Sequence, residues 1–212
     1  MQDYTMLNIL LDRSHSMQLK KEDTIKGVNQ LIKEQQQQQG RCSFQLVQFS
    51  KPSDWYETYV IEDIKDVPPL TRETYNPMGT STALIDSAVK MIDVLGKNLA
   101  YTQPSERPAR VMVVIVTDGE ENSSVKFKKA DLNGRIKHQT EKYNWQFLFL
   151  GTNQDAIYEA AQYGIKGDHA FTYLNTTEGI AAAYSQTSDI LTAMRMVKED
   201  EMKDQGYSTT NG

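Results

Sequence analysis

The sequence predicts an α/β protein built on a three-layer, doubly wound, mostly parallel sheet. Apolar runs typical of strands alternate with amphipathic helical patterns along the chain, as in consecutive βαβ units. Several of these runs lack polar alternation, which is typical of strands that are buried on both faces. The 212 residues are enough for one sizeable domain of this class. We expect the strand order 3-2-1-4-5-6, one antiparallel edge strand and helices on both faces.

The first βα unit is predicted from its apolar spacing. Residues 6–11 form an apolar run and are expected to be a buried strand. A helix is expected from about Lys20, because Ile25, Val28 and Ile32 recur at the spacing of one helix face.

The following runs predict a hairpin and the second half of the sheet. Residues 44–49 and 55–61 are separated by a short Ser/Pro/Asp linker, so the second run is expected to be the antiparallel edge strand. The most apolar run, 111–116, is predicted to be a central strand. A helix is expected at 83–99, and a second helix is expected to be capped by Asp131 with Leu132, Ile136 and Tyr143 inward. Strands are expected at 147–151 and 169–174, with a short helix capped by Asn153 between them. The last helix is expected to begin with a capping box from Asn175 to Glu178.

Composition and charge exclude several classes of protein. A net charge of −5 and a pI near 5.3 predict no nucleic-acid partner. The single cysteine, Cys42, excludes an internal disulfide and fits a reducing compartment. We see neither a signal sequence nor a membrane-spanning stretch and expect a cytoplasmic protein with no membrane partner. Residues 1–203 are expected to be one domain, and 204–212 a flexible polar tail.

Oxygen-bearing side chains follow two of the predicted strands. Asp12, Ser14 and Ser16 alternate just beyond the first strand, and Asp118 follows the central strand in Thr-Asp-Gly. In the expected order these strands are neighbours at the switch point, where ligands bind beyond the carboxyl ends of the strands. Carboxylates and hydroxyls suit a hard divalent cation. Each piece alone is also typical of a turn or a helix cap, and the combination favours a metal site.

Together with a threonine that opens the helix after Gly79, these residues resemble a von Willebrand factor type A domain with a metal-ion-dependent adhesion site. The resemblance spans about residues 4–197 and is to the small stand-alone type of bacteria and their viruses. It implies Mg²⁺ (or Mn²⁺ or Ca²⁺) held by Asp12, Ser14, Ser16, Thr82 and Asp118. It also implies a protein partner whose Asp or Glu completes the coordination, and a mobile last helix.

The threonine ligand has two candidates, Thr80 and Thr82. Choosing Thr82 puts apolar residues at the core positions of the following helix. Choosing Thr80 would put Asp86 at the first of them, which the cost of burying a charge disfavours. Thr82 is therefore the predicted ligand, and Thr80 is expected to support the loop.

Nearby residues have simpler interpretations. Glu120 and Glu121 are expected to form a solvated acidic loop. His15 between the two serines is expected to face away from the metal rather than to act as a base. Arg13, His15, Met17 and Met78 are expected to form the rim of the site.

The resemblance implies a non-catalytic protein-binding module that depends on a divalent metal, meets its partner in trans and serves as an adaptor to a larger assembly. Two alternatives stay open. One is a Mg²⁺-dependent phosphatase or phosphotransferase with Asp12 as nucleophile, although Ser14 stands where that pattern needs a second carboxylate and we find no convincing phosphate-binding lysine. The other is the same scaffold with partners bound at another surface.

Overall fold

The computed structural model describes residues 4–118, 120–151, 156–174 and 176–196. Within them the strands form a six-stranded sheet in the order β3-β2-β1-β4-β5-β6. All neighbouring strands are parallel except β2 and β3, which pair antiparallel at one edge. The predicted fold class, strand order and antiparallel edge strand are confirmed.

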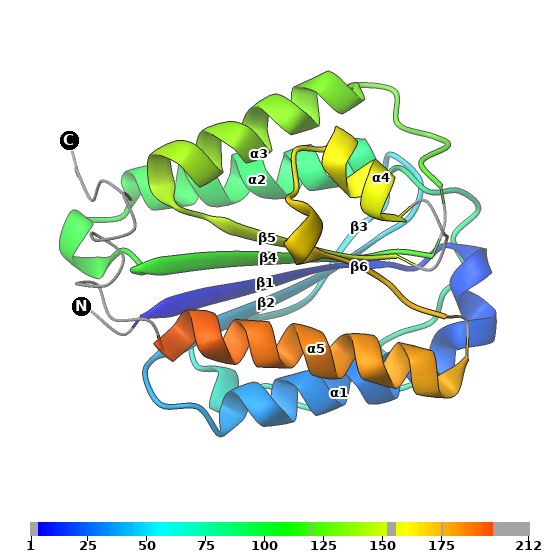
Figure 1. Ribbon diagram of the computed structural model, residues 1–212, viewed down its shortest axis with the longest axis horizontal. Coiled ribbons are helices and arrows are strands. Elements are labelled where there is room, and N and C mark those ends of the chain that lie inside the picture. The colour runs from blue at the N-terminus through cyan, green and yellow to red at the C-terminus, as the bar shows by residue number, and fades with distance from the viewer. Residues whose placement is uncertain (1–3, 119, 152–155, 175, 197–212) are drawn as a thin grey trace.

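Helices cover both faces of the sheet, which gives three layers (Figure 1). α1 and α5 pack against each other on one face, and α2, α3 and α4 lie on the other. The strands are β1 Thr5–Asp12, β2 Cys42–Phe49, β3 Trp55–Ile61, β4 Arg110–Val116, β5 Gln146–Gly151 and β6 Ala170–Thr172. The helices are α1 Lys21–Gln36, α2 Leu84–Tyr101, α3 Lys129–Tyr143, α4 Ala156–Gln162 and α5 Thr177–Met196.

The central strand β1 serves two cores because its side chains alternate between the faces of the sheet. Leu7, Ile9 and Leu11 belong to the core beneath α1 and α5, whereas Leu10 belongs to the core beneath α2 and α3. This two-sided burial explains why the run that predicted β1 is almost continuously apolar. It also fixes the end of β1, and therefore Asp12, in a rigid setting.

In α3 the buried positions agree with the prediction better than the residue that caps the helix. Leu132 and Ile136 are buried as expected, but Tyr143 is 52% exposed, so its predicted inward position is wrong. Asp131 is not the N-cap of α3: it lies in the first turn, and its carboxylate accepts a hydrogen bond from the backbone N–H of Lys128. The predicted caps Asn153 and Asn175 and the expected boundary at residue 203 lie outside the described residues.

The structure also bears on the reactivity of Cys42 and on the search for a membrane-spanning helix. Cys42 is fully buried, and burial raises the pKa of its thiol to about 11, which makes it an unreactive core residue. In the part of the chain that is described, no helix combines the length and apolar character that crossing a bilayer requires.

Candidate functional site

Asp12 ends β1 and is completely buried. One carboxylate oxygen, Oδ1, accepts a hydrogen bond from the backbone N–H of Ser14 at 2.7 Å, and the other, Oδ2, accepts one from the hydroxyl of Thr117 at 2.7 Å. Burial raises the pKa of Asp12 to about 6, and the nearby Asp118 adds to that rise, while the Thr117 and Ser14 hydrogen bonds oppose it. Asp12 is therefore a fixed carboxylate whose charge the protein only partly compensates.

A chain of oxygen atoms leads from the first loop to the second. The hydroxyls of Ser14 and Ser16 lie 3.0 Å apart, and the Ser16 hydroxyl donates to Asp118 Oδ1 at 2.7 Å. β1 and β4 are neighbours in the sheet, so Asp118 reaches this loop from more than one hundred residues away in the sequence. Four of the five predicted ligands are thus joined by short contacts.

The loop that contains Gly79 runs directly beside the Asp12–Ser16 loop. The backbone N–H of His15 donates to Gly79 O at 2.8 Å, and Gly79 N–H donates to Arg13 O at 3.0 Å. A Cβ atom at Gly79 would collide with the side chain of Ser50. Glycine is required at this position because the Ser50 side chain fills the space that a Cβ atom would occupy.

Of the two candidate threonines, Thr82 is 2% exposed, whereas Thr80 is exposed. Thr82 is tied to the loop after β4: its N–H donates to Asn122 Oδ1 at 2.9 Å, and its carbonyl accepts from Asn122 N–H at 3.0 Å. These bonds hold Thr82 and the Asp118 loop in one unit.

The expectation that a charge at Asp86 cannot be buried is wrong. Asp86 is only 6% exposed although it carries a carboxylate. Its oxygens accept hydrogen bonds from three successive backbone N–H groups, those of Val125, Lys126 and Phe127, at 2.9 to 3.2 Å. These bonds offset the cost of burial. Thr82 is buried and bonded to Asn122 through its backbone, and its role as the threonine ligand stays a prediction.

The acidic residue Glu121 is not a solvated loop residue as expected. Its Oε2 accepts a hydrogen bond from the backbone N–H of Ile85, in the first turn of α2, at 2.7 Å. Its Oε1 accepts from the N–H groups of Ser123 and Ser124. Negative charge at a helix N-terminus is favourable, so Glu121 fixes the loop after Asp118 to α2. Glu120, in contrast, is exposed.

Lys20 is the site residue that the sequence analysis missed. It ends the short 3-10 helix over His15–Lys20, is 9% exposed, and its ammonium forms an ion pair with Asp118 Oδ2. A lysine four residues after Ser16, at the start of a helix that packs on the sheet, was the available signal. This lysine pairs with Asp118 and not with Asp12, so it does not supply the phosphate-binding lysine that the phosphatase pattern needs beside Asp12.

The predicted rim is correct only in part. Met17 is fully buried in the core beneath α1, so it cannot contact a partner. His15 is exposed, and Met78 is 58% exposed. The Arg13 guanidinium lies over the ring of Tyr56, at 5.7 Å from its centroid, and donates to Asn76 O at 3.4 Å.

The spacing of these oxygen atoms suits a divalent cation. Among the described residues no group of three or more His, Cys, Asp and Glu side chains could hold a metal, so hydroxyls would have to supply part of the ligand set. Neighbouring ligands of an octahedral Mg²⁺ lie about 2.9 Å apart, given bond lengths of about 2.0–2.1 Å. The contacts from Ser14 to Ser16 (3.0 Å) and from Ser16 to Asp118 (2.7 Å) match that spacing. These oxygen donors fit the ion, but the ammonium of Lys20 already contacts one of them, Oδ2 of Asp118.

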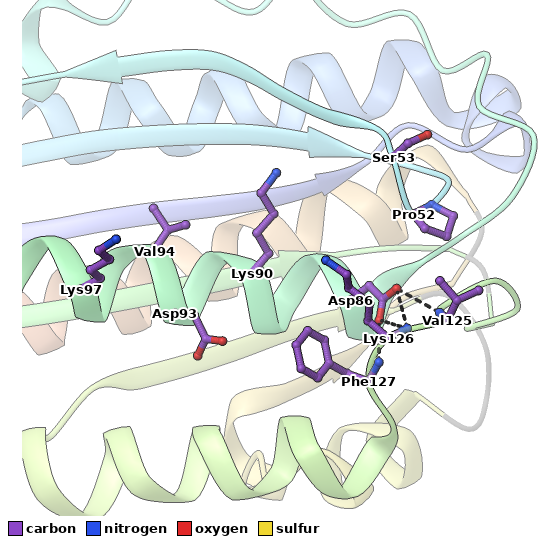
Figure 2. A pocket seen from close by; sticks show the side chains of 10 residues that line it. All are labelled: Pro52, Ser53, Asp86, Lys90, Asp93, Val94, Lys97, Val125, Lys126 and Phe127. Atoms are coloured by element: carbon purple, nitrogen blue, oxygen red, sulfur yellow. Dashed lines mark hydrogen bonds between the residues drawn. The ribbon is translucent and has the colours of Figure 1, made fainter.

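A separate pocket of about 550 Å³ lies along the outer side of α2, away from these residues (Figure 2). Figure 2 shows Asp86 at one end with its bonds to the backbone of Val125, Lys126 and Phe127. Lysine and aspartate side chains line much of it. The lining residues are Pro52, Ser53, Asp86, Lys90, Asp93, Val94, Lys97, Val125, Lys126 and Phe127.

The fold and the site together define a doubly wound α/β protein with converging oxygen side chains at its switch point. The family model of the von Willebrand factor type A domain matches residues 7–195. The chain belongs to this family. A search of curated protein sequences found no significant match.

Solved structures support the fold. A crystal form of proximal thread matrix protein 1 from the mussel byssus has a TM-score of 0.63 at 15% identity, with 90% of this chain and 49% of that chain covered. The pilus adhesin SpaC from Lactobacillus rhamnosus GG, in an open conformation, has a TM-score of 0.63 at 10% identity, with 91% and 30% covered. The conserved hypothetical protein BatB from Bacteroides thetaiotaomicron has a TM-score of 0.51 at 15% identity, with 88% and 98% covered. The chain thus spans about half of the mussel protein and less than a third of the adhesin.

Proposed function

We propose that this protein is a non-catalytic binding module in which a partner's carboxylate completes the coordination of a divalent cation, Mg²⁺ or else Mn²⁺ or Ca²⁺, between the ends of β1 and β4. The observation that carries the proposal is the row of oxygens from Ser14 through Ser16 to Asp118, at 3.0 and 2.7 Å. Membership of a family that often mediates protein interactions agrees with it.

Two of the proposed ligands are anchored by neighbouring residues, Asp12 through its carboxylate and Thr82 through its backbone. Thr117 and the Ser14 backbone hold Asp12, and Asn122 holds Thr82. Ser16 is the exposed member of the set, so it marks the side from which a partner would approach. A hard cation with few anionic ligands attracts an additional carboxylate. The proposed ligand set is Asp12, Ser14, Ser16, Thr82 and Asp118.

The phosphatase alternative is less well supported. A nucleophilic carboxylate must reach the substrate, but Asp12 is completely buried and both of its oxygens accept hydrogen bonds. Ser14 has no carboxylate to act as the acid and base of such a reaction. Turnover of a phosphate ester that Asp12→Asn abolishes would support this alternative instead.

The proposed setting is a reducing, cytoplasmic one, in which the module acts in trans as an adaptor to a larger assembly, of the small bacterial or bacteriophage type. The buried free thiol of Cys42 is consistent with that setting. The partner is proposed to be a protein that supplies one Asp or Glu to the cation. A nucleic acid is not the proposed partner, because the chain carries a net charge of −5.

The proposal predicts that Asp118→Asn loses both Mg²⁺ binding and partner capture, because it removes one of two carboxylates from the ligand set. Calorimetric titration measures the first, and a pull-down from the source cells in Mg²⁺ and in chelator measures the second. Glu120→Gln is the matched control, since it removes an exposed carboxylate from the same loop and should bind normally. Capture that persists in chelator and in Asp118→Asn but is lost in Lys90→Glu would move the function to the pocket on α2.

A further inference from the structure

Lys20 differs from the other lysines near the site in the direction of its side chain. Its side chain is 10% exposed and ends at Asp118, whose side chain is 1% exposed. The next residue, Lys21, turns away and donates from Nζ to Asn76 Oδ1 at 3.1 Å in an exposed contact. Only the first lysine of this pair therefore brings its positive charge to the proposed ligand set.

The carboxylate of Asp118 contacts both a proposed metal ligand, Ser16, and the ammonium of Lys20. Its Oδ1 accepts from Ser16, and its Oδ2 is paired with the Lys20 ammonium. A buried carboxylate needs such a counter-charge. A divalent cation on the same carboxylate would stand close to the ammonium, and like charges in a poorly solvated setting repel strongly. The Asp118 carboxylate can therefore bind the ammonium or the metal ion strongly, but not both at the same time.

We propose that Lys20 is a built-in competitor for the divalent cation: its ammonium neutralises Asp118 in the metal-free protein and must leave before the ion binds. The inference rests on the proposed metal-dependent function. A lysine suits this role because it is a compact charge on a flexible four-carbon stem that can swing to the surface. Lys20 would then lower the metal affinity and keep the site closed until the concentration of the ion is high enough.

Titration with Mg²⁺ distinguishes this role from that of a merely structural ion pair. We expect Lys20→Met to bind Mg²⁺ at least about tenfold more tightly than the unmodified protein, because the competing charge is gone. Lys21→Met removes the same charge one residue away and should stay within about twofold. Lys20→Arg keeps the positive charge and should not show the gain in affinity.

Thermal unfolding supplies a second readout. In chelator, Lys20→Met should melt at a lower temperature than the unmodified protein, because Asp118 has lost its counter-charge. Saturating Mg²⁺ should remove that deficit, because the ion replaces the ammonium and binds the folded state. Lys20→Gln, which keeps a polar head, is the second neutral variant for both measurements should Lys20→Met fail to fold.

The outcomes separate the two proposals. Equal or weaker Mg²⁺ binding by Lys20→Met or Lys20→Gln, with normal binding by the unmodified protein, overturns the competitor role and leaves the metal site intact. A gain that Lys21→Met shares would show only a general effect of net charge and also overturns it. No binding by any of the proteins, including the neutral Lys20 variants, overturns the proposed metal site and the competitor role together.

Discussion

Asp12 is a costly residue in the metal-free protein because its ionised form is buried. Its pKa rises to about 6 from an ordinary value of 3.8, mainly through desolvation. A carboxyl with a folded-state pKa above its unfolded value stabilises the fold most at low pH. That contribution is lost as the pH rises from about 4 through about 6, the window between the two values. At neutral pH the ionised Asp12 therefore opposes folding unless a cation compensates it.

This predicts that Asp12→Asn is stabilising without metal. The amide keeps the size of the side chain, its Oδ1 can still accept from Ser14, and it removes the buried charge. In chelator at pH 7.5 we expect the free energy of unfolding to rise by roughly 1–3 kcal/mol, the upper value corresponding to the full rise of the Asp12 pKa from 3.8 to about 6. The gain should shrink as the pH falls to 4.5, where Asp12 itself is protonated.

Urea unfolding at the two pH values measures this effect. Asp168→Asn, which neutralises an exposed carboxylate, serves as the control and should change the unfolding free energy little at either pH. A loss of stability in Asp12→Asn at both pH values would show that the carboxylate is needed for its hydrogen bonds, whatever its charge.

At the scale of elements, α5 is fastened to α1 by a buried arginine. Arg195 is 7% exposed and donates from Nη1 to Gln35 O at 2.7 Å and from Nη2 to Gln39 O at 3.2 Å. The guanidinium thereby satisfies carbonyls at the C-terminal end of α1, where positive charge is favourable. The mobile last helix implied by the family resemblance stays a prediction, and these bonds mean that movement of this end of α5 would require breaking them.

Replacing Arg195 tests how much this fastening contributes. Arg195→Met keeps the aliphatic stem but removes the charged donors to the Gln35 and Gln39 carbonyls, so we expect a loss of about 2–4 kcal/mol in unfolding free energy. Arg135→Met is the control, because its ion pair with Asp93 at 2.8 Å is partly exposed, with side chains 32% and 50% exposed, and should contribute less than about 1 kcal/mol. Equal losses in urea unfolding of the two variants would contradict the special role of Arg195.

Helix periodicity predicted the elements better than their ends. Val28 and Ile32 are buried on the predicted face of α1 because repeated apolar spacing reports an average over several turns. End residues depend on single partners from distant segments. The role of Glu121 at the start of α2 follows from a contact with Ile85, 36 residues earlier. Nothing in the local sequence distinguishes such a cap from a solvated acidic loop.

For the whole molecule, the switch point explains why the candidate site could be predicted at all. Strand order alone brings Asp12 and Asp118 together at the carboxyl ends of the neighbouring central strands β1 and β4. The contacts with Ser14 and Ser16 then join them. Lys20 could not be predicted in the same way, because its orientation depends on how the short helix after Ser16 packs. The spacing after Ser16 could single out this lysine, but only the structure shows that it pairs with Asp118.

The same geometry predicts how Mg²⁺ acts on unfolding. The proposed ligands come from segments at Asp12–Ser16, Thr82 and Asp118, which meet only when the central sheet and the start of α2 are both formed. An ion bound there must stabilise the whole fold, by about 2.7 kcal/mol at one hundred times its dissociation constant. We expect the urea midpoint to rise with Mg²⁺ while the dependence on urea concentration keeps its slope, because the surface exposed on unfolding is unchanged.

Asp118→Asn should abolish this rise, and Glu120→Gln should retain it. If Mg²⁺ leaves the urea midpoint of the unmodified protein unchanged but raises that of Lys20→Met, the ammonium, and not a missing ligand, keeps the ion out. A midpoint that rises equally in Asp118→Asn would instead place the bound ion elsewhere on the molecule.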